Sequence, residues 1–123
     1  MSASSAPANL RIRILFGDRA MLGPGKIDLL NHIRETGSIA AAGRAMNMSY
    51  KRAWMLVEEM NAAFREPLVA SARGGKAGGG AHLTETGQAV LTLYRHMEDT
   101  VAKAGAAQVR ALEGLLRDIP HEK

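Results

Sequence analysis

The chain has 123 residues, which is enough for one ordinary domain with its own hydrophobic core but not for two. It contains no cysteine, so disulfides, thiolate catalysis and cysteine-ligated zinc or iron–sulfur sites are excluded. The 16 Lys and Arg residues outnumber the 12 Asp and Glu residues, and the formal net charge of +4 favours a polyanionic partner such as nucleic acid.

The first residues, MSASSAPAN, are small and mostly polar, and we expect residues 1–9 to form a disordered tail. This start has neither the basic region nor the apolar region of a secretory signal. No apolar run in the chain approaches the ~18 residues that are needed to cross a bilayer. We therefore expect a cytoplasmic protein with no membrane partner.

A strand and a helix are predicted after the tail. The sequence LRIRILF, residues 10–16, alternates apolar residues with arginine, which is the period of a half-buried strand. The sequence GPGKIDLLNHIRETG predicts a first helix, because Pro24 suits a first helical turn and Gly37 is a stop signal. The apolar face of this helix is formed by Ile27, Leu30 and Ile33.

Two more helices follow, separated by a tight turn. Ser38 can cap a short helix, SIAAAGRAM, whose small residues let another helix approach closely. Asn47 and Met48 form the turn, Ser49 can cap the third helix, and Pro67 ends it. The apolar positions of the third helix recur at steps of four, three and four residues: Ala53, Val57, Met60 and Phe64.

A hairpin and a long helix complete the prediction. LVASAR and AHLT are typical of two short strands, and the intervening GGKAGGG suits a flexible hairpin tip. Thr84 can cap a last helix, residues 85–118, with a tail at 119–123. A heptad-like seam on this helix favours packing against a partner helix, and Gly105 is a place where the helix can bend or break. The seam consists of Val90, Tyr94, Met97, Val101, Ala104, Gln108, Ala111 and Leu115.

Two helices joined by a tight turn and followed by a hairpin are typical of a winged helix-turn-helix, an α+β fold. Residues 37–57 and 67–84 together contain five Lys or Arg and no acidic residue, although the whole chain is only mildly basic. Positive charge is thus concentrated on the two elements that face DNA in this fold, which predicts duplex DNA as the partner. The predicted DNA-binding residues are Ser38, Arg44, Ser49, Tyr50, Lys51, Arg52, Trp54, Arg73, Gly75, Lys76 and Gly78.

Trp54 and the methionines are the remaining large apolar side chains of the helices to be placed. Trp54 lies beside the Ala53 and Val57 face, so it either packs against the second helix or reaches the DNA backbone with its indole. Methionines are flexible apolar side chains that more often fill a core than form a binding surface. We expect core positions for Met46, Met48, Met55, Met60 and Met97.

Motifs for enzymatic and metal chemistry do not fit the sequence. In the glycine loop Lys76 is followed by Ala77 rather than Ser or Thr, so the P-loop pattern fails. The histidines form no H-x-x-x-H pair, and the adjacent Glu58 and Glu59 point about 100° apart on a helix. We therefore predict no enzyme, no cofactor and no metal site. The rivals that remain are a protein-interaction adaptor and, less favoured, a small nucleotide-binding enzyme.

Three segments, GSIAAAGRAMNMSYKRAW, EEMN and GGKAGGGAHLTETGQ, resemble the N-terminal DNA-binding domain of the ModE family of molybdate-responsive transcription regulators. The resemblance runs from about residue 10 to residue 100, and GSIAAAG alone would also suit LysR-type regulators. It implies a winged helix that dimerises through its long last helix. In that family molybdate binds to separate C-terminal β-barrel modules, so we expect no molybdate site within this chain and a link to molybdenum uptake or use.

These expectations combine into one model. A winged-helix domain, residues 10–84, binds duplex DNA and regulates transcription, and residues 85–118 form the helix through which it becomes a symmetric homodimer. Two recognition helices related by a twofold axis then read half-sites of a near-palindromic operator, about 34 Å or roughly 10 bp apart or a multiple of that.

Overall fold

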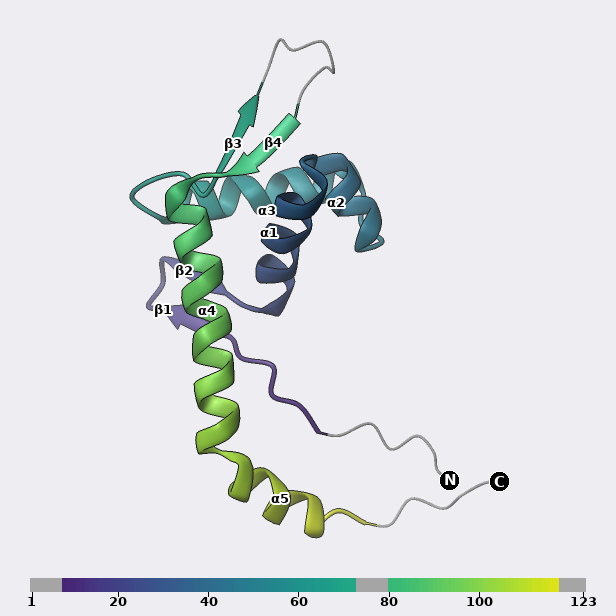
Figure 1. Ribbon diagram of the computed structural model, residues 1–123, viewed down its shortest axis with the longest axis vertical. Coiled ribbons are helices and arrows are strands. Elements are labelled where there is room, and N and C mark those ends of the chain that lie inside the picture. Colours follow the sequence, from purple (N-terminus) through teal and green to yellow (C-terminus); the bar gives the residue numbers. More distant parts are fainter. Residues whose placement is uncertain (1–7, 73–79, 118–123) are drawn as a thin grey trace, which may run out of the picture.

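The computed structural model describes residues 8–72 and 80–117 (Figure 1). Its elements are β1 (Ile14–Phe16), β2 (Ala20–Leu22), α1 (Pro24–Thr36), α2 (Ile39–Ala45), α3 (Tyr50–Ala63), β3 (Val69–Ala72), β4 (Gly80–Leu83), α4 (Glu85–Ala104) and α5 (Ala106–Gly114). Helices α1, α2 and α3 gather at one end, the β3–β4 hairpin projects beyond them, and α4 runs away in the opposite direction. We call residues 14–97 the head and residues 98–114 the arm.

The core of the head lies between the first three helices, the wing strands and the start of α4. Local signals start and stop the helices as the sequence predicts: Pro24 is in the first turn of α1, and Gly37 ends it with a φ of 70°. The wholly buried apolar side chains of α1 include all three predicted face residues. The core cluster comprises Leu22, Ile27, Leu29, Leu30, Ile33, Ala42, Ala53, Val57, Met60, Leu68, Val69, Ala81, Leu91 and Tyr94.

The N-terminal strand is shorter than predicted and has a partner that the sequence pattern did not indicate. β1 begins only at Ile14 and pairs antiparallel with β2, with Ile14 opposite Leu22 and Phe16 opposite Ala20. The prediction of a strand over residues 10–16 is therefore wrong for residues 10–13, because the three-residue β2 offers them no pairing. Phe16 packs edge-on against Phe64 with ring centroids 6.4 Å apart, which attaches this hairpin to the end of α3.

The wing is an antiparallel pair in which Val69 lies opposite Leu83 and Ala72 opposite Gly80. Its base is fastened to α3 by Asn61, whose Oδ1 accepts from the N–H groups of Leu68 at 2.8 Å and Val69 at 3.1 Å. The Asn61 Nδ2 also donates to the carbonyl of Val69 at 3.1 Å. One side chain thus satisfies three backbone groups and fixes the wing relative to the third helix.

α4 starts immediately after the wing and passes very close to it. The Thr84 Oγ1 accepts from the N–H of Gly87, which confirms the predicted cap, and donates to the carbonyl of Pro67 at 2.6 Å. At Gly87 a side chain has no space, since an added Cβ would lie 2.1 Å from the Leu68 carbonyl oxygen. A glycine is therefore required where α4 crosses the first residues of the wing.

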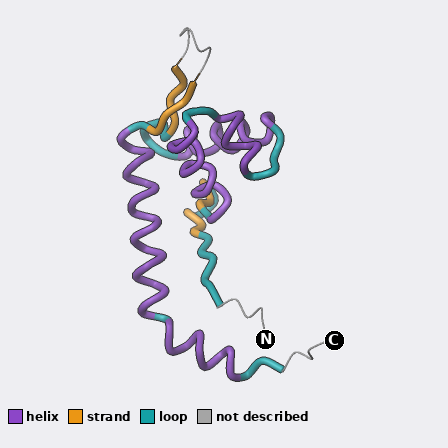
Figure 2. The backbone as a smooth tube through the Cα atoms, turned by 45° about the vertical axis from the view of Figure 1, so that its right-hand side comes forward, coloured by secondary structure: helices purple, strands orange, loops and turns teal. Residues whose placement is uncertain are grey.

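The predicted single helix over residues 85–118 is divided at Gly105 into α4 and α5, and α5 ends at Gly114. The seam is divided too. Its first members, Val90, Tyr94 and Met97, pack on the head, whereas Val101 is exposed and α5 has no buried residue. Figure 2 shows α5 turned away from the axis of α4. Residues 8–10 line an open surface cleft together with one side of α5. The predicted tails at residues 1–9 and 119–123 lie wholly or largely outside the described residues.

Candidate nucleic-acid interface

α2, the turn and α3 form a rigid helix-turn-helix. Ser38 caps α2 by accepting from the N–H of Ala41, and Asn47 turns the chain with a φ of 58°. Gly43 allows the two helices to approach, because an added Cβ there would lie 3.1 Å from the Cβ of Ala53. The orientation of α3 is therefore set by close packing of Ala53 against the backbone of α2 at Gly43.

The front of α3 offers hydrogen-bond donors to an anion. The Ser49 Oγ accepts from the N–H of Arg52 at 3.0 Å, as predicted for a cap. The preceding amides, those of Tyr50 and Lys51, lie in the first helical turn, where an α-helix provides no acceptor. Together with the positive end of the helix dipole, these amides make the start of α3 suitable for a phosphate oxygen.

Three cations belong to the end of α2 and the first turn of α3. Arg44, Lys51 and Arg52 are exposed. Among the described residues, the ion pairs join Lys26, Arg34, Arg95 and Lys103 to carboxylates, and none involves these three cations. Their charge is thus directed to solvent and not neutralised within the part of the head that the structure describes.

Carboxylates appear only farther along α3. Glu59 forms an ion pair with Lys26 at 3.3 Å, and Lys26 also donates to the carbonyl of Met21 at 3.0 Å. This contact connects the third turn of α3 with α1 and β2. α3 is consequently cationic at its first turn and acidic in its third.

The wing starts beside this surface. The Ala81 N–H donates to the carbonyl of Gly37 at 2.9 Å, so β4 is attached to the end of α1 just before α2 begins. Arg73, Gly75, Lys76 and Gly78 are predicted DNA-binding residues that lie outside the described residues. Their roles stay predictions, while the described strands on either side fix where the wing leaves the head.

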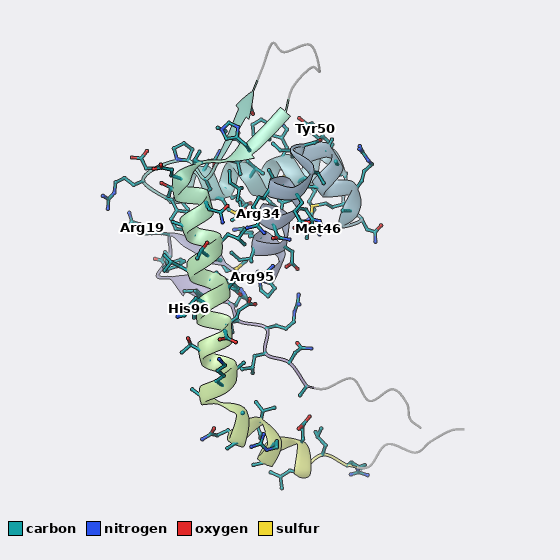
Figure 3. The ribbon with its side chains drawn as sticks, viewed as in Figure 1. Arg19, Arg34, Met46, Tyr50, Arg95 and His96 are labelled. Atoms are coloured by element: carbon teal, nitrogen blue, oxygen red, sulfur yellow. The ribbon has the colours of Figure 1, made fainter. Side chains whose placement is uncertain are left out.

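The structure brings together the predicted site residues that it describes. Ser38, Arg44, Ser49, Tyr50, Lys51, Arg52 and Trp54 all belong to the helix-turn-helix. In Figure 3 the labelled Tyr50 lies on the opposite side of the head from Arg19. Trp54 is partly exposed and is not a member of the core cluster, so it does not serve as a core residue.

Sequence reasoning missed two contributors to this surface. Met55 is exposed, so its predicted core position is wrong, while Met60 is buried and Met46, Met48 and Met97 are partly buried against the core. The position of Met55 in the helix could have indicated its exposure, because two steps of 100° separate Met55 from the buried Ala53 and from the buried Val57. Asn61 was also missed, since its contacts with β3 have no local sequence signal.

The described residues offer neither a metal-binding cluster nor a membrane-spanning helix. Within residues 8–72 and 80–117, no His, Asp and Glu side chains gather in a group of three that could hold a metal ion. No helix in the same ranges is both long enough and apolar enough to span a membrane.

Comparison with known proteins gives a family match. The model of the bacterial regulatory helix-turn-helix proteins of the lysR family matches residues 25–88, from the first turn of α1 to the start of α4. Among solved structures, the crystal structure of a CbnR_DBD–DNA complex superposes with a TM-score of 0.55 at 20% identity. The match covers 72% of this chain and 95% of that one and confirms the α+β winged helix-turn-helix fold.

Three curated relatives are similar over most of the chain. They are the molybdenum-pterin-binding protein MopB of Rhodobacter capsulatus, the transcriptional regulator ModE of Yersinia pestis and the DNA-binding transcriptional dual regulator ModE of Escherichia coli K12. They are 46%, 40% and 37% identical over 68%, 71% and 79% of this chain. The matches cover 31%, 33% and 37% of those proteins, so this chain spans about a third of their length.

Proposed function

Since the chain belongs to the lysR family of bacterial regulatory helix-turn-helix proteins, and resembles ModE and MopB over most of its length, we propose that it is a sequence-specific DNA-binding regulator of transcription. One observation carries the proposal. The helix-turn-helix carries a capped, donor-rich start of α3 and three exposed cations that form no ion pair among the described residues.

In the proposed complex the first turns of α3 enter the major groove, which admits a helix and exposes a distinct donor and acceptor pattern for each base pair. Lys51 and Arg52 donate to guanine N7 and O6 or to neighbouring phosphates. Ser38, Ser49 and Arg44 contact phosphates and so set the orientation of the helix without reading sequence. Arg73 and Lys76 add charge contacts from the wing, and Gly75 and Gly78 let its backbone approach the DNA.

The functional unit in this proposal is a homodimer. Within the described residues α5 has no buried side chain and its Leu112 is exposed. Just after its end, Leu115 is 81% exposed and Leu116 is also strongly exposed. Apolar side chains gathered on an uncovered helix are typical of a surface that packs on another copy. Two heads related by a twofold axis would present α3 to half-sites of a near-palindromic operator about 34 Å apart.

The names of the relatives suggest the process that is regulated. MopB of Rhodobacter capsulatus is named as a molybdenum-pterin-binding protein, and ModE of Azotobacter vinelandii as a molybdenum transport protein. We therefore place the proposed targets among genes for molybdenum uptake or use, controlled in the cytoplasm.

The test is selection of bound duplexes from a random pool at about physiological salt, with the wild type and the double variant Lys51→Ala, Arg52→Ala. We expect an enriched palindrome that the variant binds weakly. The matched control is Arg19→Ala, Arg65→Ala, which removes the same charge from exposed positions outside the helix-turn-helix. Equal losses in the two double variants would mean nonspecific attraction only, and absence of any binding would favour the adaptor function.

A salt titration gives an independent measure. If each protomer neutralises about four phosphates, the dimer neutralises about eight. The logarithm of the association constant should then fall against the logarithm of the salt concentration with a slope near −7. A slope near −1 would contradict the proposed DNA interface.

A further inference from the structure

The outer face of α3 carries apolar side chains that the fold does not use. Tyr50, Trp54 and Met55 are 54%, 38% and 47% exposed, although the same helix buries Ala53, Val57 and Met60. These three side chains and Lys51 line one shallow surface groove, which ends at Glu58 and Glu59. We call Tyr50, Trp54 and Met55 the apolar patch.

Helix geometry explains why Trp54 and Met55 of the apolar patch do not reach the core. Trp54 and Met55 follow the buried Ala53 by one and two steps of 100°, so Met55 projects almost directly away from the core and Trp54 lies at its edge. Substituting polar residues there would cost the core little. The presence of a tryptophan and a methionine at these positions therefore requires another explanation, and contact with a partner supplies one.

The size of the patch argues against a protein partner. A specific protein interface buries roughly 800 Å² on each side, built from about 20 or more residues. Three partly exposed side chains interrupted by Lys51 and bounded by two carboxylates provide only a small fraction of that area. A compact apolar contact within a larger polar interface suits the patch better.

Duplex DNA provides such a contact. The rims of the major groove are phosphates and its floor is mostly hydrogen-bonding groups, but each thymine adds a C5 methyl group that apolar side chains contact. The charges along α3 match this arrangement, with cations in the first turn beside the patch and carboxylates beyond it. Glu58 and Glu59 would be repelled by phosphates, so the DNA contact should end near Met55.

We propose that the apolar patch reads thymine C5 methyl groups in the operator half-site. This inference rests on the proposed DNA-binding function and adds the base chemistry that α3 selects. Five residue steps from Tyr50 to Met55 correspond to about 7.5 Å along the helix, or about two base-pair rises of 3.4 Å. The half-site therefore contains thymine at one or two adjacent positions that face the second turn of α3, next to the positions reached by Lys51 and Arg52.

The experiment replaces individual thymines of the enriched duplex with deoxyuridine, which removes only the methyl group and keeps every hydrogen-bonding group. We expect one or two positions in each half-site at which the wild-type Kd rises about fourfold, the effect of losing one buried methyl-sized group. Replacement of the same position in both half-sites should raise it about 16-fold, since each protomer loses one contact. Deoxyuridine outside the half-sites is the control.

The variants Trp54→Ala and Met55→Ala connect this effect with the patch. Each variant should bind the thymine duplex more weakly than the wild type. At the thymine that its lost side chain contacts, the Kd for the deoxyuridine duplex should exceed that for the thymine duplex by less than about twofold. Leu15→Ala removes a similarly exposed apolar side chain from β1, 63% exposed, and should keep the full fourfold discrimination. Because the readout is a ratio between two DNAs, a change in folding of a variant affects both measurements equally.

The outcomes separate this inference from the proposed function. Tight sequence-specific binding with no response to deoxyuridine at any half-site position would overturn methyl reading and leave the regulator standing. Failure of the wild type to bind any duplex would overturn both, and a protein contact would then be the remaining use of the patch. Discrimination that survives in both patch variants would also overturn the assignment to Trp54 and Met55.

Discussion

α3 and α5 both expose apolar side chains, but they stand in different relations to the rest of the chain. α3 buries Ala53, Val57 and Met60 in the core and is fastened at both ends, by the Ser49 cap and by Asn61. α5 has no buried residue, and the chain connects it to the head through α4. The outer residues of α3 are thus held in place by the core, whereas the side chains of α5 can be buried only by packing against a partner. The two regions should respond very differently to the same kind of substitution.

The largest difference is expected between two glycines. Gly87→Ala places a Cβ 2.1 Å from the Leu68 carbonyl oxygen, so α4 or the wing must move, and we expect a loss of about 4 kcal/mol in the free energy of unfolding. Gly114→Ala, at the end of α5, meets no atom of the described residues within 4 Å. It should change the free energy of unfolding by less than about 1 kcal/mol, in the stabilising direction. Urea unfolding of the two variants measures both values.

Two leucines give the next largest contrast. Leu30 is wholly buried in α1, and Leu30→Ala should cost about 3 kcal/mol through lost contacts and a cavity. Leu115→Ala removes an exposed side chain and should change the free energy of unfolding of the dilute, monomeric protein by less than about 0.5 kcal/mol. The same variant should raise the dissociation constant of the dimer in sedimentation equilibrium. A large loss of monomer stability in Leu115→Ala would mean that α5 packs on its own head.

The smallest of these effects concerns the polar fastening of the wing. Asn61→Ala leaves three partly buried backbone groups of Leu68 and Val69 without their partner, and we expect a loss of about 2 kcal/mol. DNA binding should weaken further, because the wing is no longer held to α3. Asn31→Ala is the matched control, since Asn31 only accepts from the exposed Arg34 side chain and should cost less than about 0.5 kcal/mol. Equal losses in the two variants would show that Asn61 does not fasten the wing.

Local signals predicted most of the head. Ser38, Ser49 and Thr84 are caps in the structure, Gly37 ends α1 in the left-handed region, and the apolar periods of α1 and α3 mark the buried faces. These features are readable because each depends on residues within one helical turn. The same holds for the candidate site, whose described members follow one another along the helix-turn-helix.

The features that sequence reasoning missed depend on distant contacts. β2 is only three residues long, which is too short for an alternating pattern to appear, and its existence depends on pairing with β1. Asn61 resembles any polar helix residue until β3 is placed beside it. The division of the seam depends on how far the head extends along α4, because Tyr94 is buried there and donates to the carbonyl of Ile12, while Val101 lies beyond reach. Burial raises the pKa of the Tyr94 phenol, and the negative charge of Glu98 raises this pKa further.

The bend at Gly105 has a consequence for how such a regulator changes over time. In the proposed dimer, the direction in which α5 leaves α4 decides how far apart the two copies of α3 lie, while the side chains at the front of α3 decide which bases are read. The half-site spacing of the operator and its base sequence are then determined by separate parts of the chain, about 50 residues apart. A substitution near Gly105 can move the protein to operators with a different gap between unchanged half-sites. A substitution at Trp54 can change the half-site sequence that is bound and leave the gap unchanged.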